Sequence, residues 1–245
     1  MFFIISKRIK LWYNYFGDLM KKYYKYELNM LLMNILAIVI FVVPIIILEI
    51  CGFHTIVNIQ PSIFIIGMVF YLILHELFHG LGYSLFAKDK KNIKFGIVLE
   101  KGVLYAACQE KINKNAILIS LLLPTIFLSI ITFPIGMILN LNYLVIYSII
   151  NFAGAIGDIL MTVLIVRGPK DLEYLDYNND IGAYLISKSD LSEFKSLGFH
   201  LTEQGIASEK KVDKSIKRFY VSKTSGLILM LLIFIYIINI ILKFI

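Results

Sequence analysis

The sequence predicts an all-α polytopic membrane protein with about five transmembrane helices and a possible small β-hairpin after the second helix. Two observations lead to this fold class. The chain has 245 residues, is 59% hydrophobic and has a mean hydropathy of +0.79, a composition that soluble globular domains rarely show. Several apolar runs approach or exceed the roughly 20 residues that a helix needs to cross a bilayer.

The chain begins with a basic and aromatic stretch, residues 1–28, in which six lysine and arginine residues lie among Phe, Trp and Tyr. Such a stretch favours the surface of an anionic bilayer, so we expect an interfacial segment that could be an amphipathic helix. The predicted spans follow at about residues 29–50, 62–86, 116–139, 143–166 and 224–242. Residues 29–166 then form a four-span core, residues 167–222 a polar soluble segment, and residues 223–245 a C-terminal transmembrane helix.

Positive charge is distributed unevenly between the two ends of these spans. The N-terminal segment, the 87–115 loop and the 167–222 segment hold nearly all the lysine and arginine, whereas the loops at 51–61 and 140–142 hold none. Because positive charge marks the cytoplasmic side, we expect a cytoplasmic N-terminus, a cytoplasmic 167–222 segment and an extracellular C-terminus. The net charge of +7 is thus explained better by a multi-pass topology in a cell membrane than by nucleic-acid binding. The composition, rich in Ile, Lys and Asn, suggests that the membrane is bacterial.

The loop after the second span contains two apolar runs, at residues 95–99 and 103–107, around the sequence Glu-Lys-Gly. Two such runs with a glycine-containing turn between them are typical of a β-hairpin. An ordinary cytoplasmic loop is the alternative. Because the 92–110 stretch follows the second span directly, either structure would lie beside the residues that this span carries.

The second span contains the sequence HELFH at residues 75–79. His75 and His79 are four residues apart, so their imidazoles lie on one helix face and can bind the same metal ion. Glu76 is then close enough to act as a general base for water at that metal. Because histidine and glutamate are costly in lipid, this spacing predicts a metal site rather than a chance match or a buried polar network.

A catalytic zinc site needs a third protein ligand. Asp158 is the candidate because it is the only acidic residue in the fourth span; a carboxylate that packs helices together is the alternative. Measured from the estimated cytoplasmic end of each span, Asp158 lies roughly 12 Å deep, His79 roughly 11 Å and His75 roughly 17 Å. The three side chains can therefore meet at one level of the membrane. Asn151, two turns earlier on the same face, is a candidate for positioning a substrate.

Small residues surround the candidate ligands. They let transmembrane helices approach closely, so we expect the second and fourth spans to be in contact at the metal. Pro124 in the third span is expected to kink that helix or to open space near the site. The small residues concerned are Gly80, Gly82, Gly154 and Gly157.

The HELFHG sequence in the second span, with NFAGAIGD in a later span, resembles the bacterial putative zincin peptidase family, whose pattern is similar to that of site-two intramembrane proteases. The resemblance covers about residues 62–185, and residues 174–182 resemble the short tail that follows the second motif. It implies His75, His79 and Asp158 as zinc ligands and Glu76 as the base. One departure is the order Gly157-Asp158 without a nearby proline, where site-two proteases usually carry Asp-Gly.

These observations predict a membrane-embedded zinc metalloendopeptidase, with Zn2+ as its cofactor. Its expected partners are the lipid bilayer and a membrane protein or peptide substrate. There are two alternatives from other classes. A non-proteolytic metal-binding membrane protein, such as a transporter or sensor, would tolerate the loss of Glu76, and a degenerate accessory membrane protein would bind no metal. The intact glutamate and histidines favour the protease.

Overall fold

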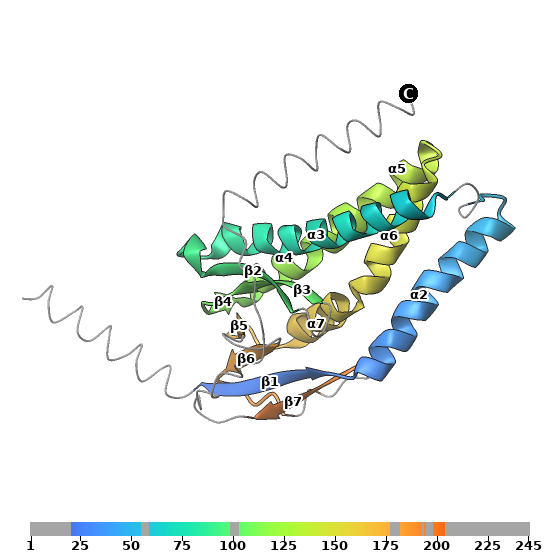
Figure 1. Ribbon diagram of the computed structural model, residues 1–245. Helices are drawn as coiled ribbons and strands as arrows, with labels where there is room; N and C mark the ends of the chain where they lie inside the picture. Colours follow the sequence, from blue (N-terminus) through green and yellow to red (C-terminus); the bar gives the residue numbers. More distant parts are fainter. Residues whose placement is uncertain are drawn as a thin grey trace, which may run out of the picture.

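The structure is a computed structural model that describes residues 21–54, 59–98, 103–176, 182–192, 194 and 198–203. Figure 1 shows apolar helices packed against one another and strands gathered near the ends where α2 begins and α3 ends. The first 20 residues and the predicted fifth span at 224–242 lie outside the described residues.

Helices occupy the positions of the first four predicted spans. They are α2 (Met30–Ile50), α3 (Pro61–Phe86), α4 (Lys114–Thr125), α5 (Thr132–Ile138), α6 (Asn142–Gly154) and α7 (Ile156–Arg167). A π-helical turn, η2 (Ile126–Ile131), joins α4 to α5. In the described part of the chain, Leu31–Ile50, Pro61–Phe86 and Lys114–Ile138 are long and apolar enough to cross a membrane. The pair α6 and α7, bent by 50°, makes a fourth candidate if it is one broken span.

Local sequence explains where these helices begin and where one of them is irregular. The side chains of Asn29 and Asn113 cap α2 and α4 by accepting hydrogen bonds from backbone N–H groups of the first turn, and Pro61 begins α3, where its missing N–H is harmless. Pro124 lies inside α4 and cannot donate to the carbonyl of Ser120, four residues earlier. The helix widens into η2 shortly after this proline, as expected near a break in the hydrogen-bond ladder.

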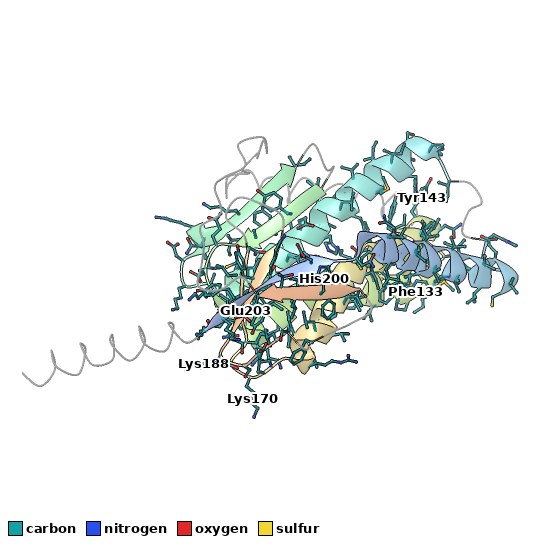
Figure 2. All side chains as sticks on the ribbon, turned by 90° about the horizontal axis from the view of Figure 1, so that it is seen from below. Phe133, Tyr143, Lys170, Lys188, His200 and Glu203 are labelled. Carbon is teal, nitrogen blue, oxygen red and sulfur yellow. The ribbon has the colours of Figure 1, made fainter. Side chains whose placement is uncertain are left out.

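An antiparallel sheet of five strands lies beside the helices, in the order β4-β5-β6-β1-β7. The strands are β1 (Lys22–Leu28), β4 (Ile112–Asn113), β5 (Glu173–Asp176), β6 (Ala183–Ser187) and β7 (Phe199–Glu203). Figure 2 shows His200 and Glu203 on β7, where they pair with Glu27 and Lys22 of β1 at 3.0 and 3.2 Å. The sheet thus combines residues before α2, residues between α3 and α4, and residues after α7, and the prediction of an all-α protein is wrong.

The strands were missed because they are short and because their pairing joins residues far apart in the chain. In β1 the buried Tyr24 and Tyr26 alternate with the half-buried Lys25 and Glu27, which is the period of a strand with one buried face. The same aromatic and basic composition also suits an interfacial helix. Only the partner strands, more than 150 residues away in sequence, distinguish the two structures.

The hairpin predicted after the second span is confirmed. After a short 3-10 turn, η1 (Lys90–Asn92), the strands β2 (Ile93–Val98) and β3 (Val103–Cys108) pair antiparallel. The hairpin packs on α3 at Gly80, where an added Cβ would lie 2.0 Å from the ring of Phe95. Glycine at this position therefore lets the hairpin approach the helix that carries HELFH.

The largest core cluster lies between the sheet and the ends of three helices. It joins β1 and β6 to α3, α4 and α7, and these helices carry the predicted site and its neighbours. The sheet therefore holds these helix ends in fixed positions. Members of the cluster include Tyr24, Tyr26, Tyr83, Ile117, Met161, Leu164, Ile165 and Leu185.

Candidate metal centre

Two helices bring the three predicted ligands together. His75 and His79 lie on α3, Asp158 lies in the first turn of α7, and one ligand atom from each lies within 4.8 Å of the others. The two histidine Nε2 atoms are 3.0 Å apart, and Asp158 Oδ2 is 3.1 Å from His75 Nε2 and 3.4 Å from His79 Nε2. His79 is buried and the other two residues are half-buried.

These separations suit a small metal ion. In a tetrahedral site with nitrogen and oxygen ligands, the ligand atoms lie roughly 3.3–3.6 Å from one another. The three atoms are therefore within a few tenths of an ångström of that arrangement. Two imidazole nitrogens and a carboxylate oxygen are also donors that catalytic zinc sites use, so His75, His79 and Asp158 could hold a metal ion.

His79 is oriented by a backbone carbonyl from α4. Its Nδ1 lies 2.8 Å from the carbonyl oxygen of Ser120, the group whose usual helical donor, the N–H four residues later, is absent at Pro124. A hydrogen bond donated by Nδ1 fixes the tautomer in which Nε2 carries the free lone pair. The proline in the third span thus leaves an acceptor for a candidate metal-binding histidine.

His75 is oriented by Asn151 of α6. The distance from His75 Nδ1 to Asn151 Oδ1 is 2.9 Å, and Asn151 Nδ2 donates to Ser129 Oγ at 2.8 Å and to the Pro124 carbonyl at 3.3 Å. Both ends of the Asn151 amide are therefore engaged with protein atoms. The sequence analysis predicted Asn151 as a substrate-positioning residue, and the structure places it against a candidate ligand.

Asp158 follows the bend between α6 and α7. The fourth span was predicted as continuous over residues 143–166, but α6 ends at Gly154 and α7 begins at Ile156. The first turn of a helix is the positive end of its dipole, which favours a carboxylate. The bend thus places Asp158 at a helix start, facing the two histidines.

The glycines near the candidate ligands were expected to let the second and fourth spans approach closely, and not all of them do so. A Cβ on Gly82 would lie 2.5 Å from the Cα of Ser120, whereas a Cβ on Gly154 would meet nothing within 4 Å. The close backbone approach at Gly82 is therefore between α3 and α4, the second and third spans. The second and fourth spans meet instead through side chains, since His75 contacts both Asn151 and Asp158.

Glu76, the predicted base, contacts the hairpin. Its Oε2 accepts a hydrogen bond from the backbone N–H of Ala106 in β3, at 2.6 Å. Two residues along the same strand, the N–H of Cys108 donates to Asp176 Oδ2, also at 2.6 Å. Alternate N–H groups of β3 thus face away from β2 and toward two carboxylates.

Asp176 is a residue that the sequence analysis did not single out. It is buried at the end of β5, and Tyr174 donates to its Oδ1 at 2.6 Å. Burial raises the pKa of Asp176 to about 7, although the hydrogen bonds from Tyr174 and Cys108 oppose this shift. The sequence analysis also missed the Ser120 carbonyl, which Pro124 could have indicated, and the Ala106 N–H, for which the sequence carries no signal.

A histidine pair with an intervening glutamate and a carboxylate from another helix defines a zinc-metallopeptidase type of site. Residues 68–172 match a family described as "Putative zincin peptidase". This range includes both histidines, Glu76, the hairpin and Asp158, and it supports a zincin-type metallopeptidase that uses zinc. Comparisons with curated proteins and with solved structures each found no match.

Proposed function

We propose that this protein is a membrane-embedded zinc endopeptidase that hydrolyses peptide bonds of membrane or membrane-associated substrates. The position of Glu76 carries the proposal. This residue lies on the same helix as the two histidines, and its carboxylate contacts the edge of a β-strand. Candidate metal ligands, a base and a backbone edge suited to a peptide therefore meet at one place.

His75, His79 and Asp158 would hold the zinc ion, and Ser120 and Asn151 orient the two imidazoles. When bound, zinc supplies a Lewis acid that polarises a peptide carbonyl and makes water more acidic. Within the described part of the chain the ligand group has three members. A three-ligand set leaves a position for water or substrate, as hydrolytic sites require.

Glu76 is the proposed general acid–base. It takes a proton from the attacking water as the water oxygen bonds to the peptide carbon, and it gives that proton to the amine as the C–N bond breaks. In the structure the same carboxylate accepts the Ala106 N–H. A peptide carbonyl that replaced Glu76 as acceptor would therefore free the carboxylate for catalysis.

The outer edge of β3 is the proposed binding site for the substrate backbone. Since Ala106 and Cys108 donate away from β2, the N–H of Leu104 faces the same way by strand alternation. An extended peptide can add to such an edge as a further strand. A transmembrane substrate would first have to unwind, because helical carbonyls are already hydrogen-bonded.

The arrangement of the strands supports the proposed membrane topology. The start of α2, the end of α3, the start of α4 and the end of α7 all lie toward the strands (Figure 1), and these are the ends that positive charge assigns to the cytoplasm. Large apolar side chains are exposed along α2, as a lipid-facing helix requires. They include Leu31, Ile38, Ile46, Ile47 and Ile50. We therefore propose a bacterial plasma-membrane location with a cytoplasmic N-terminus and an extracellular C-terminus.

The test combines metal content with peptide cleavage in detergent-purified full-length protein. We expect about one zinc per chain in the wild type and in Glu76→Gln, and loss of zinc in His79→Ala and Asp158→Ala. A peptide library incubated with each protein and read by mass spectrometry should be cleaved by the wild type alone. Folded wild type that takes up no supplied zinc would overturn the proposal. Zinc binding without any cleavage would favour the transporter or sensor.

A further inference from the structure

A buried hydroxyl in the core cluster that borders α3 and α7, the helices carrying the candidate ligands, has no hydrogen-bond partner among the described residues. Tyr26 of β1 is 7% exposed, and its phenolic oxygen has no partner among the described residues. Burying an unpaired hydroxyl opposes folding, and native interiors contain few such groups. An orphaned donor of this kind calls for an acceptor that the described residues do not supply in this arrangement.

The surroundings of Tyr26 connect it to the candidate ligands. Its core cluster also contains Tyr83, one turn beyond His79 on α3, and Met161, three residues beyond Asp158 on α7. Burial and then the negative charge of Asp158 raise the pKa of the Tyr26 phenol above its ordinary value. The phenol therefore stays protonated near neutral pH and is available as a hydrogen-bond donor.

Asp158 has an oxygen available for such a donor. Its Oδ2 contacts both histidines, while its Oδ1 has no hydrogen-bond donor within the described ranges. Carboxylates that bind metals are themselves held by hydrogen bonds from surrounding residues, which fix their orientation. The two histidines already have such partners in Ser120 and Asn151, so Asp158 is the candidate ligand that lacks one.

We propose that the Tyr26 hydroxyl donates to Asp158 Oδ1 when the metal is bound, directly or through one water, and so directs Oδ2 toward the ion. This inference rests on the proposed zinc site. Tyr26 is then a positioning residue that acts through Asp158. It makes β1, which precedes α2, part of the metal centre.

Tyr24 provides a matched control on the same strand. It lies two residues before Tyr26 on the same face, it is fully buried, and its hydroxyl donates to Asp190 Oδ1 at 3.1 Å. If both tyrosines only packed the core, Tyr24→Phe would harm the protein more, because it removes an existing hydrogen bond. Tyr26→Phe would then be neutral or stabilising, because it removes an unpaired hydroxyl.

The experiment measures zinc affinity by chelator competition, and thermal unfolding of the metal-free form, on full-length protein in detergent. We expect Tyr26→Phe to raise the Kd for zinc about tenfold while leaving the metal-free Tm unchanged or higher. Tyr24→Phe should lower the metal-free Tm and keep the Kd for zinc within about twofold of the wild type.

Four results would overturn the inference. A wild-type Kd in Tyr26→Phe would show that its hydroxyl does not act on Asp158. An equal loss of affinity in Tyr24→Phe, or a lower metal-free Tm in Tyr26→Phe, would show that the strand matters only for packing. Absence of zinc from the wild type would overturn the proposed metal site as well, so the two failures are distinguishable.

Discussion

The substitution Gly82→Ala should weaken zinc binding although it replaces none of the candidate ligands. The new Cβ would lie 2.5 Å from Ser120 Cα, and ordinary contacts begin at 3.4 Å. Helix α4 must therefore retreat by about 0.9 Å, the difference between these two distances. His79 Nδ1 is 2.8 Å from the Ser120 carbonyl, so a retreat along this direction would stretch the hydrogen bond to about 3.7 Å, beyond its useful range.

Two effects follow from this displacement. Overpacking a well-packed contact typically lowers the free energy of unfolding by about 1–3 kcal/mol. Loss of a partner that orients a metal ligand typically weakens metal binding about 10–100-fold, which corresponds to about 1.4–2.8 kcal/mol of binding free energy. We therefore expect Gly82→Ala to show both a lower Tm and a Kd for zinc raised at least about tenfold.

The assay is chelator competition for zinc, with thermal unfolding of the same samples, and Gly154→Ala is the control. Gly154 also lies near the site in a helix, but its added Cβ meets open space. Its affinity for zinc should stay within about twofold of the wild type, with the helix slightly stabilised. Folded Gly82→Ala with wild-type affinity, or an equal loss in Gly154→Ala, would refute the reasoning.

Three further predictions concern groups around the site. Pro124→Ala restores an N–H that competes with His79 for the Ser120 carbonyl, so zinc affinity measured by chelator competition should fall by up to about tenfold; an unchanged Kd would contradict this. Burial raises the pKa of Asp176 from 3.8 to about 7, so the folded state holds this proton more tightly than the unfolded state does. The protonated Asp176 therefore stabilises the folded state fully at pH values below its unfolded-state pKa, and this stabilisation is lost as the pH rises through its folded-state pKa. The Tm of the wild type should therefore fall more between about pH 4 and 7 than the Tm of Asp176→Asn does. An equal fall in the wild type and the variant would count against this prediction. Leu104→Pro removes an outer N–H of β3, and edge strands tolerate proline. It should raise KM for peptide cleavage with zinc content unchanged, and an unaltered KM would argue against strand addition.

The clustering of the candidate ligands was predictable in large part because their spacing obeys local geometry. The spacing of His75 and His79 places both imidazoles on one face of any helix, and Asp158 is the single acidic residue of its span. The hairpin after α3 was predictable from two apolar runs and a glycine-containing turn. The large sheet was not, because strands of two to seven residues carry little periodic signal, and a strand exists only where a partner pairs with it.

The sequence by itself determined which stretches form apolar helices and which side chains can bind a metal, because hydropathy and helical spacing act over neighbouring residues. Tertiary structure alone decided what surrounds those side chains. The Ser120 carbonyl reaches His79, the Ala106 N–H reaches Glu76, and the Asn151 amide oxygen reaches His75. Each of these relations joins elements separated by long stretches of chain, so it depends on how helices and strands pack rather than on any local pattern.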